Sequence, residues 1–302
     1  MAKPRGPIAR WLTRRLSYPL EAAAAHGFAA LCRALPVDTA SAFGGWLGRT
    51  VGPWLSGTRT ARRNLTRAFP DKSPAEIDAI ITAMWDNLGR TMAEYPHLDA
   101  LGDSGPGGRT ELVGADEVAA MRDDGKAGIV VAGHLGNWEV PCAMARKRGL
   151  EMALVYRAPN NPMVDRLLVD LRGAASATQI PKGTEGARAL IRVLAKGGHV
   201  GMLIDQKMND GIPVPFFGRD AMTAPAAALL ALRQGIPIRP MRTERLDGAR
   251  FRITVFPPLE PPATGDRNAD ARILMQRING LLESWVRERP EQWLWTHRRW
   301  PD

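Results

Sequence analysis

Hydrophobic and polar positions along the second part of the chain predict strands that alternate with helices. Residues 128–132, Gly-Ile-Val-Val-Ala, are a short apolar run of the kind found in buried strands, and residues 140–148 then follow a helical pattern. The succession continues with strands or extended segments at 152–156, 199–204, 236–241 and 251–256 and with helices at 162–171, 186–195, 224–234 and 269–288. Alternation of this kind predicts an α/β fold with a mostly parallel central sheet flanked by helices.

The first hundred residues predict helices alone. Ser73-Pro74-Ala75-Glu76 has the pattern of a capping box with proline at the first helical position, and apolar residues at helical spacing follow it. Residues 20–35 form an Ala-rich apolar stretch, but Glu21, His26 and Arg33 interrupt it, and a transmembrane helix needs roughly 20 predominantly apolar residues. We therefore expect a helix that either lies in a membrane interface or packs on the rest of the protein.

Glycine and proline set two further expectations. Residues 42–55 contain four glycines and Pro53, which predict a broken helix or a shallow re-entrant segment. The Gly/Ser/Pro-rich run at 103–109 interrupts the helical pattern. We place a boundary there, between an N-terminal helical, membrane-associating region at 1–105 and an α/β domain at 106–302.

The charge balance narrows the class of partner. The chain has 302 residues with 41 Lys and Arg against 31 Asp and Glu, a formal net charge of +10, which favours an anionic partner such as nucleic acid or an acidic membrane. The arginines are spread along the chain without a nucleic-acid-binding motif, so we expect no nucleic acid. With two cysteines there is neither a disulfide framework nor a four-thiolate zinc site, and we expect an intracellular chain without a cleaved signal peptide.

Polar side chains follow two of the predicted strands. His134 and Glu139 come after the strand at 128–132, and Asp205 and Gln206 come after the strand at 199–204. In open parallel sheets, functional groups gather at the carboxyl ends of strands. His134 is suited to act as a general base, and Glu139 could orient it if Gly136 turns the chain back. The alternative is a buried core histidine beside a solvated glutamate.

The sequence lacks the motifs of several other kinds of catalytic or binding site. The chain has no G-x-S-x-G elbow, no P-loop, no H-E-x-x-H and no C-x-x-C pair, so we expect neither a serine nucleophile nor a bound metal or cofactor. A direct reaction fits better, in which His134 deprotonates a hydroxyl that attacks an acyl thioester.

Several segments together resemble one protein family. Gly133-His134-Leu135-Gly136-Asn137-Trp138-Glu139 resembles the H-x-x-x-x-D/E motif of the late acyltransferases of lipid A biosynthesis, the lauroyl/myristoyl transferases. The other matching blocks, in family order, are Arg62-Arg63-Asn64-Leu65, Ala68-Phe69-Pro70, Asn87-Leu88-Gly89-Arg90, 156–162, 204–207, 215–218 and 290–300.

The resemblance implies transfer of a fatty acyl group from an acyl-carrier-protein or CoA thioester to a lipid hydroxyl, on the cytoplasmic face of the inner membrane. It implies a lipid A precursor as the acceptor, although a phosphatidylinositol mannoside or an ornithine-type lipid also offers a hydroxyl. The expected partners are acyl carrier protein, the lipid acceptor and an anionic membrane surface, with no cofactor beyond the acyl donor. A non-catalytic membrane adaptor is the remaining alternative.

The resemblance also implies roles for individual residues. His134 would be the base and Glu139 its partner, with Asp205 as a rival partner, because a related mannoside acyltransferase branch pairs its histidine with a later carboxylate. Arg172 and Asp205 would match further family positions needed for activity, as catalytic or oxyanion support. Arg157 is a further candidate for that support, although Arg157 and Asn160 could instead only fix the turn. The residues expected to bind substrate are Asn137, Asn160, Gln206 and Arg298.

Some aromatic and basic positions fit two interpretations each. Phe216 and Phe217 could line an acyl-chain entrance or pack in the core, and Arg299 could contact a phosphorylated lipid or belong to a solvated face. The C-terminal tryptophans fit a membrane interface or a core equally well; they are Trp285, Trp293, Trp295 and Trp300.

Overall fold

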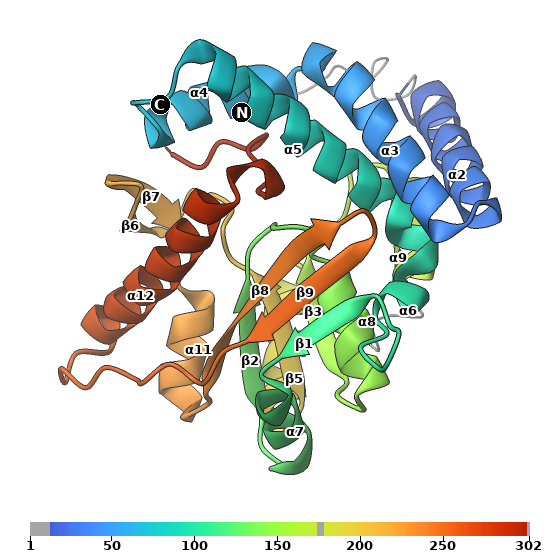
Figure 1. Cartoon of the computed structure of the whole chain (residues 1–302). Coiled ribbons are helices and arrows are strands. Elements are labelled where there is room, and N and C mark those ends of the chain that lie inside the picture. The colour runs from blue at the N-terminus through green and yellow to red at the C-terminus, as the bar shows by residue number, and fades with distance from the viewer. Residues whose placement is uncertain (1–12, 174–177, 301–302) are drawn as a thin grey trace.

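The computed structural model describes residues 13–173 and 178–300, and these residues form an α/β fold around a seven-stranded sheet (Figure 1). The strand order is β1-β9-β8-β2-β5-β3-β4; β8 and β9 are antiparallel, and the other neighbouring strands are parallel. The strands of the sheet are β1 (Thr110–Val113), β2 (Gly128–Ala132), β3 (Met152–Tyr156), β4 (Thr178–Pro181), β5 (His199–Leu203), β8 (Ile238–Asp247) and β9 (Arg250–Val255). The predicted fold class is confirmed.

Helices cover both faces of the sheet, and a separate antiparallel hairpin packs beside α12 (Figure 1). The helices of this part are α7 (Ala115–Asp123), α8 (Val140–Lys147), α9 (Pro162–Gly173), α10 (Thr184–Ala195), α11 (Ala226–Gln234) and α12 (Arg267–Glu288), and the hairpin strands are β6 (Ile212–Phe216) and β7 (Arg219–Thr223). Side chains of β2 alternate between the two faces: Ile129 and Val131 enter the core with α10, α11 and α12, whereas Val130 and Ala132 enter the core with α8.

The N-terminal helices arch over the edge at which the parallel strands end (Figure 1). They are η1 (Thr13–Ser17), α2 (Tyr18–Ala34), α3 (Val37–Val51), η2 (Gly52–Trp54), α4 (Gly57–Ala68), α5 (Pro74–Glu94), η3 (Tyr95–His97) and α6 (Leu98–Leu101). The predicted capping box starts α5, where the Ser73 hydroxyl and the Glu76 side chain bond each other's backbone N–H. Leu65 and Ile81 of these helices share one hydrophobic cluster with Val131 of the sheet. The core therefore continues across residue 105, and the division into two regions stays a prediction.

Within the segment at 42–55 the α-helix breaks at Gly52 and Pro53, as the proline predicts, but it does not break at the three earlier glycines. Helix α3 runs unbroken to Val51, and the proline falls in the short η2 turn after it. A Cβ on Gly44 would lie 2.3 Å from the carbonyl oxygen of Gly89, and one on Gly48 would lie 2.0 Å from that of Trp85. The glycines are there because α3 and α5 pack backbone against backbone, and this packing offsets the entropy that glycine costs a helix.

In the part of the chain that the structure describes, no helix combines the length and the apolar character needed to cross a bilayer.

Candidate active site

The sheet brings His134 and Asp205 together. They follow β2 and β5, which are adjacent parallel strands with Ala132 in register with Leu203. The Nδ1 atom of His134 lies 2.7 Å from Oδ1 of Asp205, and the backbone N–H of His134 donates to Oδ2 at 2.7 Å. Two contacts to one carboxylate fix both the ring and the backbone of the histidine.

Asp205 is fully buried and is surrounded by donors. Trp293 Nε1 donates to its Oδ2 at 2.7 Å. Burial alone would raise the pKa of this carboxyl, but the charge and hydrogen bonds of His134, together with the charge of His297, hold it well below its ordinary value. Burial lowers the pKa of His297 to about 4. Asp205 is therefore ionised at neutral pH and can act only as an acceptor.

The ionised Asp205 sets the tautomer of His134. Because Oδ1 accepts the Nδ1–H, the Nε2 atom of the neutral ring keeps its lone pair. Gln206 Nε2 lies 3.2 Å from that atom, and the Trp138 ring packs edge-on against the imidazole. His134 Nε2 is thus prepared to accept a proton.

Glu139 has different partners. It is the N-cap residue of α8, and its carboxylate receives two hydrogen bonds from Arg172, at 2.6 and 2.7 Å, and one from the Tyr95 hydroxyl at 2.7 Å. Burial acts to lower the pKa of Arg172, but its bonds to Glu139 raise it above the ordinary value. Of the two carboxylates that the sequence offered to His134, Asp205 makes the contact and Glu139 neutralises Arg172.

The turn between the histidine and the glutamate is held by the C-terminal segment. Gly136 adopts φ +56°, a conformation that favours glycine, and its N–H donates to the Gln292 carbonyl at 3.0 Å. Leu135 forms a β-bridge with Trp293, and the N–H of Leu294 donates to the His134 carbonyl at 3.1 Å. Residues 292–294 therefore act as a short extra strand against the turn.

A cavity of about 330 Å³ opens beside His134. Part of the lining consists of charged and polar side chains from the loops after the strands and from helix α9; they are His134, Glu139, Arg157, Arg172, Lys182 and Gln206. Apolar side chains of the sheet face that carries α8 line the rest, among them Val130, Ala132, Met152, Leu154, Leu203 and Met241. The arrangement suits a ligand with a polar end near His134 and an apolar remainder.

The predicted site residues divide between the cavity and other places. Arg157, Arg172 and Gln206 line the cavity with His134. Asn160 and Arg298 are exposed and are not among the residues that line it. Asn137 is completely buried, with its side chain bonded to Glu94 and to the backbone of Glu139. A direct substrate contact by Asn137 would need its side chain to leave these bonds.

The aromatic and basic residues for which the sequence left two interpretations are buried in the core. Phe216 and Phe217 are buried in an aromatic cluster, and the four C-terminal tryptophans are at most 4% exposed. Arg299 is 0% exposed and donates to the Met222 carbonyl and the Thr223 hydroxyl, so the solvated-face interpretation is wrong.

Three site residues were missed from the sequence. Trp293 holds Asp205, Tyr95 holds Glu139, and Lys182 lines the cavity next to Arg157. Trp293 was in a matching block, but no pattern linked it to a strand end about ninety positions earlier. Within residues 13–173 and 178–300, no group of three or more His, Cys, Asp or Glu side chains is placed to hold a metal ion.

Comparison with known proteins identifies the family. Residues 10–302 match the model of the bacterial lipid A biosynthesis acyltransferases. The chain is 26% identical to the lipid A biosynthesis myristoyltransferase of Escherichia coli strain K12 over 255 residues, which is 82% of this chain and 77% of that protein. It is 25% identical to the palmitoleoyltransferase of that strain, covering 88% and 86%, and 26% identical to its lauroyltransferase, covering 80% and 78%. Because the family match covers nearly the whole chain, this protein belongs to the bacterial lipid A biosynthesis acyltransferase family and is an acyltransferase.

Proposed function

We propose that this protein transfers a fatty acyl group from an acyl-carrier-protein or CoA thioester to a hydroxyl of a lipid A precursor, with His134 as the general base. The observation that carries the proposal is the hydrogen bond between the buried Asp205 and His134, which lines a cavity with both polar and apolar walls. The relatives' names, which specify myristoyl, palmitoleoyl and lauroyl transfer, support the substrate class.

The reaction follows from the tautomer of His134. Its Nε2 takes the proton of the acceptor hydroxyl as the oxygen attacks the thioester carbonyl carbon, and Asp205 stabilises the imidazolium that forms. The tetrahedral intermediate then collapses, the C–S bond breaks, and His134 returns the proton to the leaving thiolate. The products are an ester and a thiol, and no covalent enzyme intermediate is needed.

Arg172 is suited to bind the oxyanion. Its Nε and Nη2 atoms bond Glu139, while the buried Nη1 atom has no hydrogen-bond partner among the residues that the structure describes. Arg172 also lines the cavity. A preorganised cationic donor next to the reacting carbonyl stabilises the charge that develops there. Arg157 and Lys182 supply further positive charge at the mouth.

Exposed apolar side chains of the N-terminal helices support docking to a membrane. Trp54 is 88% exposed, Leu20 is 70% exposed, and Leu16, Trp46 and Leu55 are each about half exposed. Together with the net charge of +10, this surface fits the cytoplasmic face of an inner membrane with anionic lipids. The same charge favours an acidic acyl carrier protein as donor.

The proposal is tested first by mass spectrometry of the lipids, including lipid A, from the source organism with and without the gene. Loss of one acyl chain from lipid A is the expected result. Loss of a chain from another glycolipid or an aminolipid would correct the acceptor, and an unchanged lipid profile would contradict the proposal unless a second gene supplies the activity.

A reconstituted assay removes that last ambiguity. Purified protein with an acyl-carrier-protein thioester and a lipid A precursor should release thiol and yield an acceptor heavier by one acyl group. The same assay with the CoA thioester identifies the donor. Failure with both donors on all three acceptor classes would overturn the proposed reaction.

A further inference from the structure

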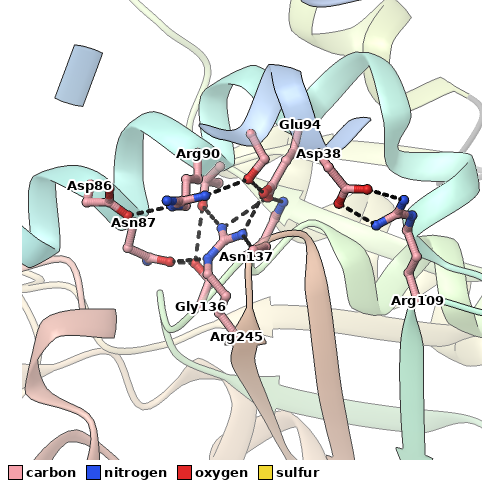
Figure 2. A network of polar contacts seen from close by, with 12 residues as sticks. Asp38, Asp86, Asn87, Arg90, Glu94, Arg109, Gly136, Asn137 and Arg245 are labelled. Atoms are coloured by element: carbon pink, nitrogen blue, oxygen red, sulfur yellow. Dashed lines mark hydrogen bonds and ion pairs between the residues drawn. The ribbon is translucent and has the colours of Figure 1, made fainter. Parts of the chain in front are cut away.

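A buried ion pair between Glu94 and Arg245 lies beside Gly136 and Asn137, two residues of the turn between His134 and Glu139 (Figure 2). Glu94 is the last residue of α5 and is 0% exposed, and Arg245 lies on β8 and is 8% exposed. Burying a carboxylate at the C-terminal end of a helix costs free energy for two reasons: the group loses its water, and it faces the negative end of the helix dipole. Hydrogen-bond donors and a positive charge around Glu94 must therefore offset this cost.

All five N–H groups of the Arg245 guanidinium are used. Two donate to the Glu94 carboxylate at 2.5 and 3.0 Å, and the others donate to Asn87, Thr91 and the Gly248 carbonyl. Ser41 of α3 adds a hydrogen bond to Glu94 at 2.6 Å. The ion pair thus fastens two N-terminal helices to the sheet.

The same carboxylate reaches the turn through Asn137. The Asn137 amide donates to Oε2 of Glu94 at 2.8 Å, and its carbonyl oxygen accepts the backbone N–H of Glu139 at 3.1 Å (Figure 2). Asn137 is completely buried, so no solvent can replace either bond. Its orientation is dictated by Glu94, which can only accept.

Two neighbours of the ion pair hold the preceding residue. Asn87 donates to the Gly136 carbonyl at 2.9 Å while its own oxygen accepts from Arg245, and the Thr91 hydroxyl donates to the same carbonyl at 3.2 Å. The turn is therefore bonded on one side by residues 292–294 and on the other side by this cluster.

We propose that Glu94 is a positioning residue for the acyl transfer reaction, acting through Asn137, with Arg245 as its obligatory counter-charge. The inference rests on the proposed function of the turn, because its importance for catalysis depends on His134 and Glu139 being used. Neither Glu94 nor Arg245 lines the cavity. They hold His134 and Glu139, the partner of Arg172, in a fixed position relative to each other.

Substitution can exchange the carboxylate of Glu94 and the amide of Asn137. Glu94→Gln leaves one acceptor oxygen where four donor groups converge, and Asn137→Asp puts two carboxylates in contact. In the double variant the new amide at position 94 donates to the new carboxylate at position 137, and one negative charge again lies in the cluster near Arg245. Each single change disrupts the contact between positions 94 and 137, whereas the pair again places a donor opposite an acceptor there. The restoration is partial, because the amide nitrogen at position 94 then faces Nη2 of Arg245, which is also a donor.

The experiment compares these three variants with Glu117→Gln, the matched control. Glu117 pairs with Arg239, another buried arginine of β8, at 3.0 Å, and touches neither the turn nor the cavity. We measure kcat and KM for both substrates, the melting temperature, and the ¹⁹F resonance of Trp138 in 5-fluorotryptophan-labelled protein, assigned with Trp138→Phe. Trp138 reports on the turn because its Nε1 donates to Glu139 and its ring packs on His134.

The expected result is a fall in kcat of about tenfold to a hundredfold in each single variant, with KM nearly unchanged and a shifted Trp138 resonance. The double variant should recover part of the lost kcat and part of the resonance shift. The control should lose thermal stability alone. Unchanged kcat and resonance in Glu94→Gln, or equal loss in the control, would overturn the proposal.

Two other results of this experiment also test the proposal: misfolding of Glu94→Gln and a wild-type protein without acyl transfer. If Glu94→Gln does not fold, the double variant and Thr91→Val, which removes one bond to Gly136, carry the same comparison. If the wild-type protein transfers no acyl group but Glu94→Gln alone shifts the Trp138 resonance, the positioning of the turn stands and the proposed function fails.

Discussion

Oδ1 of Asp205 accepts a hydrogen bond from Nδ1 of His134 at 2.7 Å, across the ends of two adjacent parallel strands. Glu139, five residues after the histidine, is instead held by Arg172. The sequence motif thus contains His134 of the proposed catalytic pair, together with Glu139, which binds the Arg172 guanidinium. The two carboxylates should therefore respond differently to substitution.

Substitution of His134 and its partner tests this difference. His134→Ala should lower kcat about a hundredfold or more, because it removes the proton acceptor. Asp205→Asn should approach that loss, since an amide no longer fixes the Nδ1–H tautomer. Steady-state rates of thiol release measure both, and circular dichroism verifies folding. Full activity in His134→Ala would refute the general-base mechanism.

Glu139→Gln should act on stability as well as rate. It leaves the Arg172 guanidinium, whose side chain is 12% exposed, without its carboxylate, and breaking such a pair costs about 3–5 kcal/mol. Urea unfolding monitored by fluorescence gives the free energy of unfolding. Arg109→Gln breaks a solvent-exposed ion pair with Asp38 and serves as the control, with an expected cost below about 1 kcal/mol. Equal costs would contradict our account of the Glu139 pair.

Acid should destabilise the protein in two stages. Burial lowers the pKa of His297 from 6.5 to about 4, so between these values the unfolded chain binds more protons than the native state. The free energy of unfolding should therefore fall as the pH drops from 6.5 to 4. The lowered pKa of Asp205 adds stability that is present above its ordinary value of 3.8 and is lost below it. His297→Gln should flatten the first stage in a urea series, and a wild-type curve without slope there would count against this assignment.

The acyl chain preference should depend on Gly201. Gly201 of β5 lies opposite Leu154 of β3, and both residues line the cavity. A Cβ atom added at Gly201 would lie 2.9 Å from Cδ2 of Leu154. Glycine in a central strand leaves room for a ligand. Gly201→Val should shift the ratio of kcat/KM values toward shorter acyl donors, while Val200→Ile, on the opposite face of β5, should leave that ratio unchanged. An unaltered ratio in Gly201→Val would place the acyl chain elsewhere.

Membrane binding should depend on Trp54. Loss of this 88% exposed indole in Trp54→Ala should weaken binding to vesicles with anionic lipid roughly tenfold, from about 1.5 kcal/mol of lost apolar burial. Vesicle sedimentation measures the effect. Val113→Ala on β1 removes exposed apolar surface away from the N-terminal helices and should have no effect. Equal weakening by both variants would argue against a defined docking surface.

Periodic segments of the fold could be predicted from the sequence, and short or irregular ones could not. The capping box of α5 and the strands predicted at 128–132 and 199–204 depend on local patterns, and the structure confirms them, with the second strand ending at Leu203. The four-residue strands β1 and β4 and the hairpin of β6 and β7 have no period long enough to recognise. The helix break predicted for 42–55 occurs only at Pro53, because close packing of α3 on α5 overrides the low helix propensity of the earlier glycines.

In the candidate site, too, local patterns could be predicted from the sequence, and contacts that depend on the tertiary fold could not. His134 and Asp205 were found because each follows a buried strand. Their direct contact could not be derived, since it depends on β2 and β5 being neighbours in the sheet. Asn137 was predicted to bind substrate from its place in the motif, yet its side chain points to Glu94, a residue that no local pattern connects to it.

The contact between Trp293 and Asp205 has a consequence for the order of events during synthesis. Trp293 follows Asp205 by 88 residues, so during synthesis this carboxylate lacks its indole donor until residues 292–294 have left the ribosome. By the proposed mechanism, a product truncated before residue 292 would leave Asp205 without its indole donor and the turn after His134 without its extra strand, and it should not consume thioester.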